Sequence, residues 1–257
     1  MDLTGKVCVI TGASSGIGQS LAIKISLKGA TVVMAARRNS KLITIKEKID
    51  TEGGKCIGIK TDITKKLECK HLIDETINLY GKIDILILGA GVSMWSPFEE
   101  ITDISFFDDL MATNYTGAVH CIHAALPHLI SSKGMIVSCS TAQALVGFTN
   151  HSGYAASKHA LHGFLDTLDM ELNGKVQFLE ACLGWIRGTN MRSNAFGPSG
   201  TKMGETKRKH SSNSVDLDVC TDKIINAILE RKKTIYIPWK LSLIPVSYTH
   251  LRAHETS

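Results

Sequence analysis

Short runs of β-branched and aliphatic residues alternate along this chain with amphipathic stretches of helical length, and this rhythm limits the possible folds more than any other feature. Each apolar run is nearly continuous, which is typical of strands that helices cover on both faces. The expected strands are residues 6–10, 31–36, 55–60, 83–88, 134–138, 175–182 and 234–237. We therefore predict an α/β fold, a single doubly wound Rossmann-type domain with a seven-stranded parallel sheet and helices on both faces.

The stretches between these runs have the length and periodicity of helices. The expected helices are residues 16–28, 40–52, 65–80, 105–128, 154–173 and 219–231. Glycines follow four of them, at Gly29, Gly53, Gly81 and Gly174, and glycine closes a helix in the left-handed conformation without a steric penalty. Since neither a linker nor a repeat divides the chain, we expect residues 1–245 to form one domain.

Composition excludes several classes of protein. Of the 257 residues, 44% are hydrophobic and 21% are charged, which is not the composition of a disordered chain. The net charge of +5 is spread along the sequence rather than gathered in a basic stripe, so nucleic acid is not an expected partner. The seven cysteines never form a CxxC pair and mostly lie in apolar runs, which indicates free thiols in a reducing compartment and no metal site.

Targeting features favour the cytoplasm. Met1 stands only a few residues before the first expected strand, which leaves no room for a signal peptide. No apolar run reaches the ~18 residues of a membrane span. The apolar run at residues 240–244 has a basic flank, so peripheral membrane contact stays open as an alternative.

Two segments lie outside the βα rhythm. Residues 189–218 are polar and rich in glycine, serine and lysine, and a loop of this length in a compact domain is either a functional lid or disordered. We expect it to be a substrate lid. Residues 246–256, VSYTHLRAHET, resemble the translation of a transposon-end sequencing adapter and its index arm, with a genuine polar tail as the alternative. We therefore expect residues 246–257 to be a non-native tail.

A glycine-rich turn, TGASSGIG at residues 11–18, links the first expected strand to the first expected helix. Gly12 permits a sharp turn, Gly16 lets the backbone approach a pyrophosphate, and Gly18 lets the helix pack on the sheet. The helix N-terminus then offers N–H groups to the phosphates. The candidate cofactor-binding residues of this turn are Gly12, Ser14, Ser15, Gly16, Ile17 and Gly18.

The end of the second expected strand bears on which dinucleotide binds. Arg37 and Arg38 stand where an NAD-preferring site would carry an acid for the ribose 2′-hydroxyl. A guanidinium pairs instead with a 2′-phosphate, so we favour NADP(H) over NAD(H), with ordinary surface arginines as the alternative. Asp62, just past the third strand, is placed either to reach the adenine or to cap a turn.

Tyr154 and Lys158 open the fifth expected helix in the sequence YAASK. Residues four apart share one helix face, so the phenol and the ammonium point to the same place. A neighbouring ammonium lowers the pKa of a tyrosine from its usual value near 10. Tyr154 is therefore a candidate general acid and base near neutral pH.

These motifs, in this order, resemble the short-chain dehydrogenase/reductase family: TGASSGIG, Asn114 within TNYTG, hydroxyl residues after the fifth strand, and YAASK. The resemblance runs over about residues 3–238. It implies that Tyr154 exchanges a proton with the substrate oxygen and that Lys158 lowers the tyrosine pKa and holds the nicotinamide ribose. Asn114 would hold a water in the proton relay. The sequence NAFG at residues 194–197 is most similar to the subgroup around dehydrogenase/reductase member 7.

The resemblance also implies a hydroxyl that binds the substrate oxygen. The family serine stands thirteen residues before the tyrosine, where this chain has Thr141, with Ser140 just before it. We favour Thr141 over Ser140, and adjacent strand residues face opposite ways, so both cannot serve without a bend. The remaining cofactor contacts that the resemblance implies are Ile63, Ala90, Gly91, Gly184, Ile186 and Thr189.

Three positions depart from the family pattern. Leu88-Gly89-Ala90-Gly91 stands where the family has Asn-Asn-Ala-Gly, which removes two amides. Leu183-Gly184 replaces Pro-Gly, and Thr189 lies one residue later than the threonine that contacts the carboxamide. Drift in a working enzyme explains these departures, and so does a weakened cofactor site.

Together, the residues and the resemblance predict an NADP(H)-dependent oxidoreductase that interconverts a carbonyl and an alcohol by hydride transfer. Apolar side chains expected near the mouth of the site favour a small lipid, steroid or retinoid-like substrate. They are Trp95, Phe98, Phe148, Trp185, Met191 and Phe196. The alternatives are a 3-oxoacyl thioester reductase and a cofactor-binding protein with little or no turnover. The resemblance also implies a homodimer or a homotetramer.

Overall fold

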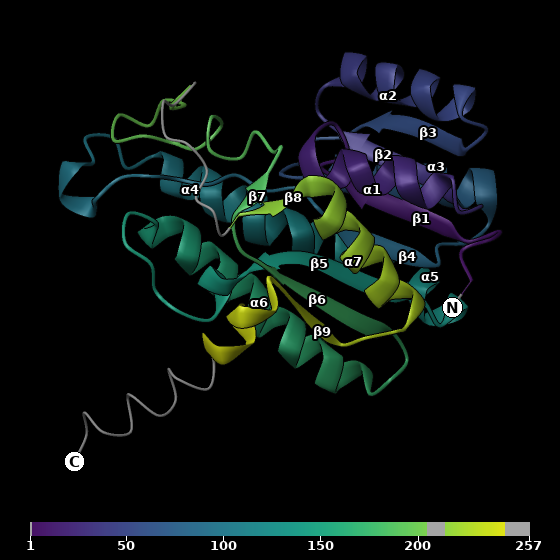
Figure 1. Ribbon diagram of the computed structural model, residues 1–257. Helices are drawn as coiled ribbons and strands as arrows, with labels where there is room; N and C mark the ends of the chain where they lie inside the picture. The colour runs from purple at the N-terminus through teal and green to yellow at the C-terminus, as the bar shows by residue number, and fades with distance from the viewer. Residues whose placement is uncertain (1, 205–213, 245–257) are drawn as a thin grey trace.

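The computed structural model describes residues 2–204 and 214–244. Seven parallel strands form one sheet in the order β3-β2-β1-β4-β5-β6-β9 (Figure 1). The strands are β1 Val7–Thr11, β2 Thr31–Ala36, β3 Lys55–Lys60, β4 Ile85–Leu88, β5 Met135–Thr141, β6 Gln177–Leu183 and β9 Thr234–Ile237. Each overlaps its predicted range, and the predicted fold class is confirmed.

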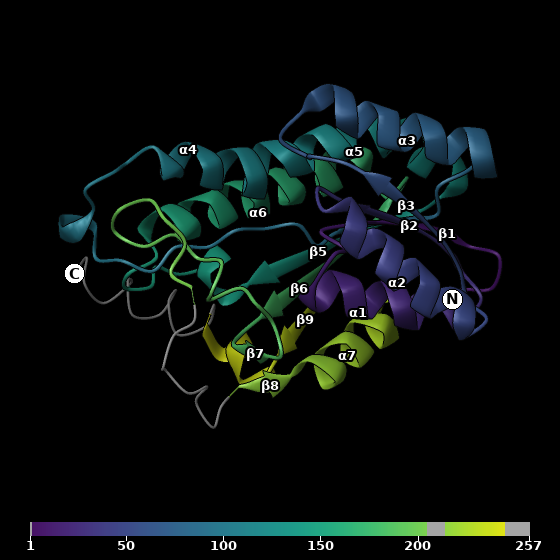
Figure 2. The same ribbon diagram turned by 90° about the horizontal axis from the view of Figure 1, so that it is seen from above.

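Helices cover both faces of this sheet. They are α1 Gly16–Ser26, α2 Asn39–Thr51, α3 Lys66–Tyr80, α4 Phe106–Met111, α5 Gly117–Ser132, α6 Ser152–Leu172 and α7 Leu217–Leu229, with short 3₁₀ turns at Phe98–Glu100, Ala142–Ala144 and Trp239–Ser242. Figure 2 shows α1, α2 and α7 on one face and α3, α5 and α6 on the other. Each layer buries its own hydrophobic core against the sheet, as a doubly wound fold requires.

One predicted helix is wrong as a single regular element. In place of a helix over residues 105–128, the chain forms α4, a π-helical segment at Ala112–Thr116 and then α5. Asn114 in this segment bonds both backbone groups of Val92: its Oδ1 accepts from the N–H at 2.9 Å, and its Nδ2 donates to the carbonyl at 2.8 Å. These two bonds hold the side chain on the loop after β4, and such wide turns are frequent at functional sites.

The strand order reverses between β1 and β4, which lie side by side in the sheet. In open α/β sheets, ligands bind outside the carboxyl ends of the strands at such a reversal. The turn after β1, the loop after β4 and the end of β5 all reach this edge (Figure 1). The topology therefore brings together the segments that carry the predicted site residues.

The described part of the predicted lid contains more structure than its composition suggests. Phe196 bridges both to Met94, in the loop after β4, and to Lys202. Two short strands, β7 Ile186–Arg187 and β8 Val215–Asp216, pair in parallel at the two ends of the segment. The lid therefore packs on the loop after β4. Its residues 205–213 and the predicted tail at 246–257 lie outside the described residues.

Within the described ranges, no helix combines the length and the hydropathy needed to cross a membrane. In the same residues, no group of three or more His, Cys, Asp or Glu side chains is arranged to hold a metal ion. All seven cysteines are free thiols, and all except Cys139 are buried.

Candidate active site

The turn from β1 into α1 closes through glycines. Gly12 has a φ of +68°, and a Cβ there would lie 2.7 Å from the backbone of Ala90. A Cβ on Gly18 would lie 2.5 Å from the carbonyl oxygen of Gly12. Only glycine permits such approaches. Gly16 has a φ of +55°, and a Cβ there would make ordinary van der Waals contact with the Thr189 side chain at 3.5 Å, so the backbone conformation rather than crowding favours glycine.

The N-terminus of α1 presents groups that bind anions. Among the described residues, no side chain caps this helix, so its first N–H groups and the positive end of its dipole face the turn. Arg38 Nη2 donates to the hydroxyls of Ser14, at 2.9 Å, and Ser15, at 3.0 Å. Ile17 packs on the hydrophobic core. Amides, hydroxyls and one guanidinium thus surround the turn.

Arg37 has different surroundings from Arg38. Burial lowers the pKa of Lys202 in the lid, and the charge of nearby Arg37 lowers it further, against the opposing charge of Asp109. The charge of Arg37 is therefore felt at Lys202 of the lid, whereas Arg38 contacts the phosphate loop. The sequence analysis named both arginines as candidates to bind a ribose 2′-phosphate and did not distinguish their positions.

Asp62 and Ile63 follow β3. The Asp62 carboxylate accepts from the backbone N–H of Thr64 at 3.1 Å and from its hydroxyl at 2.9 Å, so it caps a turn. Ile63 packs against Gly117 at the start of α5, where a Cβ would lie 2.8 Å from the isoleucine side chain. Of the two roles expected for Asp62, the turn cap is the one this structure contains.

The loop after β4, where the family has two asparagines and this chain has Leu88 and Gly89, is held by the hydroxyl of Thr11. The Thr11 hydroxyl accepts from the backbone N–H groups of Gly89, at 3.2 Å, and Ala90, at 3.3 Å, and donates to the Ile87 carbonyl at 3.3 Å. A Cβ on Gly89 would lie 2.7 Å from the Thr11 carbonyl oxygen. One hydroxyl from β1 thus ties this loop down, and the close approach favours glycine at position 89.

Asn114, Tyr154 and Lys158 come together at this edge of the sheet, and all three are buried. Asn114 Nδ2 also donates to the hydroxyl of Ser157 at 2.9 Å, which joins the π-helical segment to α6. A Cβ on Gly91 would lie 3.3 Å from Asn114 Oδ1 and 3.8 Å from Lys158 Nζ. Gly91 therefore borders both polar groups.

The predicted effect of Lys158 on Tyr154 does not occur in this structure. Burial raises the pKa of Tyr154, and burial lowers the pKa of Lys158 against the charges of Cys139 and Glu180. Lys158 Nζ lies 5.9 Å from the centre of the tyrosine ring and donates to the Cys139 carbonyl at 3.4 Å. The ammonium is therefore directed at the backbone of β5 rather than at the phenol oxygen.

Ser140 and Thr141 have different surroundings. The Ser140 hydroxyl lies near Glu180 on β6 and helps to lower the pKa of that carboxylate. Thr141 ends β5, and its hydroxyl accepts from the backbone N–H of Gln143 at 3.3 Å. The Ser140 hydroxyl is thus turned toward Glu180 on β6. Thr141 therefore remains the candidate for the hydroxyl that binds the substrate oxygen at the end of β5.

The segment after β6 closes the opposite side. Gly184 donates its N–H to the Ile237 carbonyl at 2.8 Å, and a Cβ on it would lie 3.2 Å from Pro238 Cδ. The Thr189 hydroxyl donates to the Ile186 carbonyl at 3.1 Å. Thr189 therefore stands beside Gly16 of the phosphate loop despite its one-residue shift from the family pattern.

An aromatic cluster lies beside Tyr154. His151 stacks edge-on against Trp95, with ring centres 4.8 Å apart, and its ring centre lies 6.2 Å from those of Tyr154 and Trp185. The Arg192 guanidinium lies over both indoles, 5.5 Å from Trp95 and 5.4 Å from Trp185. Sequence analysis missed His151 and Arg192, and only their contacts across the fold reveal them.

The other apolar residues predicted at the mouth differ among themselves. Phe148 joins the cluster, 5.6 Å from His151. Phe196 stacks on Phe106 in a small core that also contains Tyr154, and Phe98 packs on Phe107. Trp95, Trp185 and Phe148 are therefore the predicted residues that gather around His151, whereas Phe196 packs in the core that contains Tyr154.

Comparison with known proteins fits this geometry. Residues 6–198 match the family described as short chain dehydrogenase. The chain belongs to the short-chain dehydrogenases. These are oxidoreductases built on a nucleotide-binding Rossmann fold, so the predicted family is confirmed.

Two curated plant relatives are similar to this short-chain dehydrogenase. An 11-beta-hydroxysteroid dehydrogenase of Pinus massoniana is 39% identical over 192 residues, which is 74% of this chain and 54% of the relative. The 11-beta-hydroxysteroid dehydrogenase-like 2 of Arabidopsis thaliana is 40% identical over 196 residues, 76% of this chain and 63% of the relative. The match thus spans less than two thirds of either relative. The finer resemblance to the member 7 subgroup stays a prediction.

Solved structures share the fold. A short-chain dehydrogenase/reductase from Burkholderia phymatum in complex with NAD has a TM-score of 0.84 at 21% identity and covers 100% of this chain and 95% of its own. An alcohol dehydrogenase from Thermococcus sibiricus complexed with 5-hydroxy-NADP has a TM-score of 0.77 at 22% identity, covering 90% and 95%. The family fold thus carries a nicotinamide cofactor in both neighbours.

Proposed function

We propose that this chain is an NADP(H)-dependent oxidoreductase that interconverts a carbonyl and an alcohol on a small apolar, steroid-like substrate. The observation that carries the proposal is the meeting of Asn114, Lys158 and Gly91 at the edge of the sheet where the phosphate loop also ends. Gly91 brings the backbone of the loop after β4 close to a buried asparagine and a buried lysine, so two polar side chains and the phosphate loop border one point of the sheet edge.

The residues present fit the cofactor. Gly16, which has no side chain, begins α1, and the N-terminus of this helix has no side-chain cap among the described residues, which suits a pyrophosphate. Arg38 and the hydroxyls of Ser14 and Ser15 suit a ribose 2′-phosphate, because a guanidinium and a phosphate pair strongly. Lys158 and Asn114 would hold the nicotinamide end. When bound, the cofactor supplies or accepts the hydride.

The side chains of this protein would handle the proton. Tyr154 donates it to the carbonyl oxygen during reduction and accepts it from the alcohol during oxidation. Burial raises the pKa of Tyr154, so the phenol is held protonated, as the proton donor in reduction must be. The Thr141 hydroxyl would donate a hydrogen bond to the substrate oxygen where charge develops.

The aromatic cluster supports an apolar substrate. Trp95, Trp185 and Phe148 gather around His151, whose ring lies beside that of Tyr154. Trp185 and Phe148 are 36% and 47% exposed, so they offer a surface to a ligand. Two relatives carry the name of hydroxysteroid dehydrogenases, which is consistent with a flat polycyclic substrate. Residues 189–218 would act as its lid, within one domain of residues 1–245.

A binding titration followed by a turnover assay tests the proposal. We expect NADPH to bind more tightly than NADH, and a panel of steroid and other apolar ketones to be reduced by the protein with NADPH. Tight NADPH binding without turnover of any ketone or alcohol would favour the second candidate, a cofactor-binding protein. The raised pKa of Tyr154 is the observation that favours this second candidate.

A further inference from the structure

A buried carboxylate lies behind the candidate catalytic lysine. Glu180 on β6 faces α6, where His162 Nδ1 lies 2.9 Å from its Oε2. Lys158, His162 and Asp166 follow one another at intervals of four residues on α6, so they share one face. The helix face that carries Lys158 at the active site therefore carries the partner of Glu180 one turn later.

The surroundings keep this carboxylate ionised. Burial raises the pKa of Glu180, but the hydrogen bond and charge of His162, the Ser140 hydroxyl and the charge of Lys158 outweigh it, and the net pKa is lowered. The same hydrogen bond raises the pKa of His162. Asp166 lies on the far side of that imidazole, 3.4 Å from Nε2.

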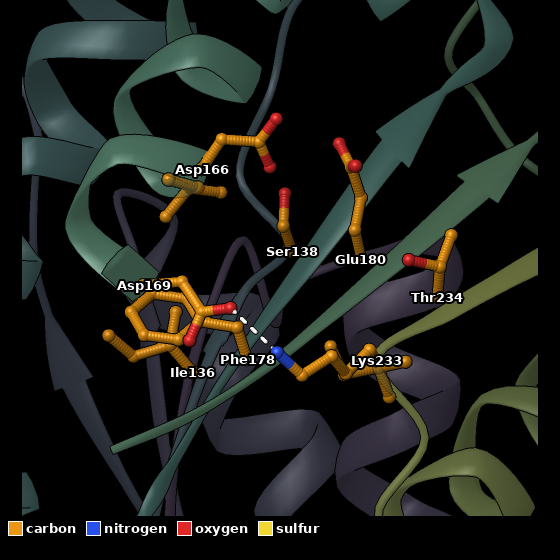
Figure 3. Close-up of a pocket in the computed structure, with 10 residues that line it drawn as sticks. Ile136, Ser138, Asp166, Asp169, Phe178, Glu180, Lys233 and Thr234 are labelled. Atoms are coloured by element: carbon orange, nitrogen blue, oxygen red, sulfur yellow. Dashed lines mark hydrogen bonds and ion pairs between the residues drawn. The ribbon is translucent and has the colours of Figure 1, made fainter. Parts of the chain in front are cut away.

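A cavity of about 150 Å³ opens on the same carboxylate (Figure 3). In the described part of the chain, Glu180 Oε1 and the buried hydroxyl of Ser138 have no hydrogen-bond partner, and both residues line this cavity. The cavity is large and polar enough for water, which can solvate the second carboxylate oxygen. Asp169 and Lys233 form an ion pair at 3.1 Å on another wall.

The other titratable groups near Glu180 are thiol and phenol. The charge of Glu180 adds to the burial that raises the pKa of Cys182, on β6, to about 12, and it likewise adds to the raised pKa of Tyr236 on β9. Both groups are therefore neutral in the pH range where the enzyme would work. Lys158 is the buried cation whose pKa the charge of Glu180 raises, and the charge of Cys139 on β5 raises it as well. Burial raises the pKa of Cys139 to about 11, so this thiol is neutral in the same pH range.

We propose that Glu180 is a positioning residue for Lys158, and that the Glu180–His162 pair keeps the buried ammonium protonated at alkaline pH. The proposal rests on the proposed function, which makes Lys158 the catalytic lysine. When His162 is protonated, the pair is neutral and acts weakly on Lys158. When His162 loses its proton, the full negative charge of Glu180 acts on the ammonium. The support thus grows over the pH range in which burial would remove the lysine proton.

A direct titration of Lys158 tests this without any turnover. In protein labelled with ¹³C-lysine, the Cε resonance of Lys158 is assigned by its loss in Lys158→Met, and its titration midpoint is measured. We expect Glu180→Gln, which removes the charge and keeps the shape, to lower this midpoint by about one pH unit. His162→Gln is the matched control: it should move the midpoint much less, because it leaves the charge of the Glu180 carboxylate in place.

The pH profile of turnover gives a second readout. In Glu180→Gln, the alkaline loss of kcat should begin about one unit lower, while kcat at pH 7 stays within about threefold. Glu180→Asp restores the charge and should restore most of the alkaline activity. A residue with only a structural role would lower kcat at every pH alike.

An unchanged Lys158 midpoint in folded Glu180→Gln overturns the proposal. If this variant does not fold, Lys158→Met measures the same coupling from the other side, since it should raise the pKa of Glu180 followed through ¹³C-glutamate. An unchanged Glu180 pKa would then overturn it. Absence of turnover in the wild-type protein would refute the proposed function instead, and the lysine titration would still decide the role of Glu180.

Discussion

Arg38 Nη2 donates a hydrogen bond of 2.9 Å to the hydroxyl of Ser14, across the start of α2 and the turn that precedes α1. This bond places a permanent positive charge on the phosphate loop itself. Arg37, one residue earlier, has no such bond to the phosphate loop among those described, and its charge lowers the pKa of Lys202 in the lid. We therefore expect substitution of these two neighbouring arginines to affect the binding of NADPH differently.

Arg38→Ala should weaken NADPH binding by about 10- to 100-fold, the usual loss for a hydrogen bond to a charged group, and should leave NADH binding within about twofold. Isothermal titration with both cofactors measures this. Arg37→Ala is the matched control, for which we expect a smaller loss. Equal losses for NADPH and NADH in Arg38→Ala would refute recognition of a 2′-phosphate by this side chain.

Tyr154→Phe should lower kcat by about 10²- to 10⁴-fold, because it removes the group that transfers the proton. NADPH affinity should stay within about twofold, since phenylalanine preserves the packing of the tyrosine ring among Met94, Phe106 and Phe196. Steady-state kinetics on a ketone that the wild type reduces, with a binding titration beside it, measure both. Unchanged turnover would mean that another group supplies the proton.

Thr141→Val should lower kcat about 10²-fold or more, the usual loss of a hydrogen-bond donor to a developing oxyanion. Ser140→Ala should have much less effect, because that hydroxyl is turned toward Glu180. Valine keeps the shape of threonine, so kcat at saturating ketone is the quantity to compare. The opposite order of the two losses would make Ser140 the substrate-binding hydroxyl.

Gly12→Ala should destabilise the protein more than Gly53→Ala. Both glycines have a positive φ, at +68° and +81°, so both substitutions carry the left-handed penalty of about 1–2 kcal/mol. A Cβ at Gly12 would also lie 2.7 Å from backbone atoms of Ala90, whereas one at Gly53 meets nothing within 4 Å. Urea unfolding should give a difference of about 2 kcal/mol or more between the variants, and equal losses would contradict the close contact.

The lowered pKa of the Asp84 carboxyl determines how this residue's contribution to the free energy of unfolding changes with pH. Burial raises its pKa, but bonds from the Val7 N–H and the ammoniums of Lys6 and Lys82 outweigh this and lower the pKa overall. Because the folded pKa is below the unfolded one, the stabilisation is present above about pH 4 and is lost as the pH falls through the folded pKa.

Asp84→Asn should therefore lower the free energy of unfolding by about 1–3 kcal/mol at pH 7, with a much smaller difference near pH 3. Urea unfolding at both pH values measures this. Asp50→Asn on the exposed face of α2 serves as the control and should change little at either pH.

The sequence predicted the sheet well and the site in part, for physical reasons. Continuous apolar runs identify buried parallel strands, and the glycines of the phosphate loop mark backbone contacts that only glycine allows. The pairing of Glu180 with His162 and the enclosure of Arg192 by two indoles join residues that are distant in the chain. No local pattern encodes such contacts.

The pKa of Tyr154 was misjudged for a related reason. Spacing on a helix says that Lys158 is on the same face, but it does not say how deeply the phenol is buried or that the ammonium bonds the Cys139 carbonyl. Burial and a competing acceptor are properties of the assembled fold. The two arginines at the end of β2 show the same limit, since only the folded loop distinguishes them.

The π-helical turn at Ala112–Thr116 makes the length of this stretch as important as its composition. Its widened turn accommodates one residue more than a regular helix would, and it holds Asn114 against Val92. Deleting a single residue here would allow one regular helix and would remove this turn, and with it the two bonds between Asn114 and Val92. Evolution can therefore exchange side chains in this segment more readily than it can shorten it.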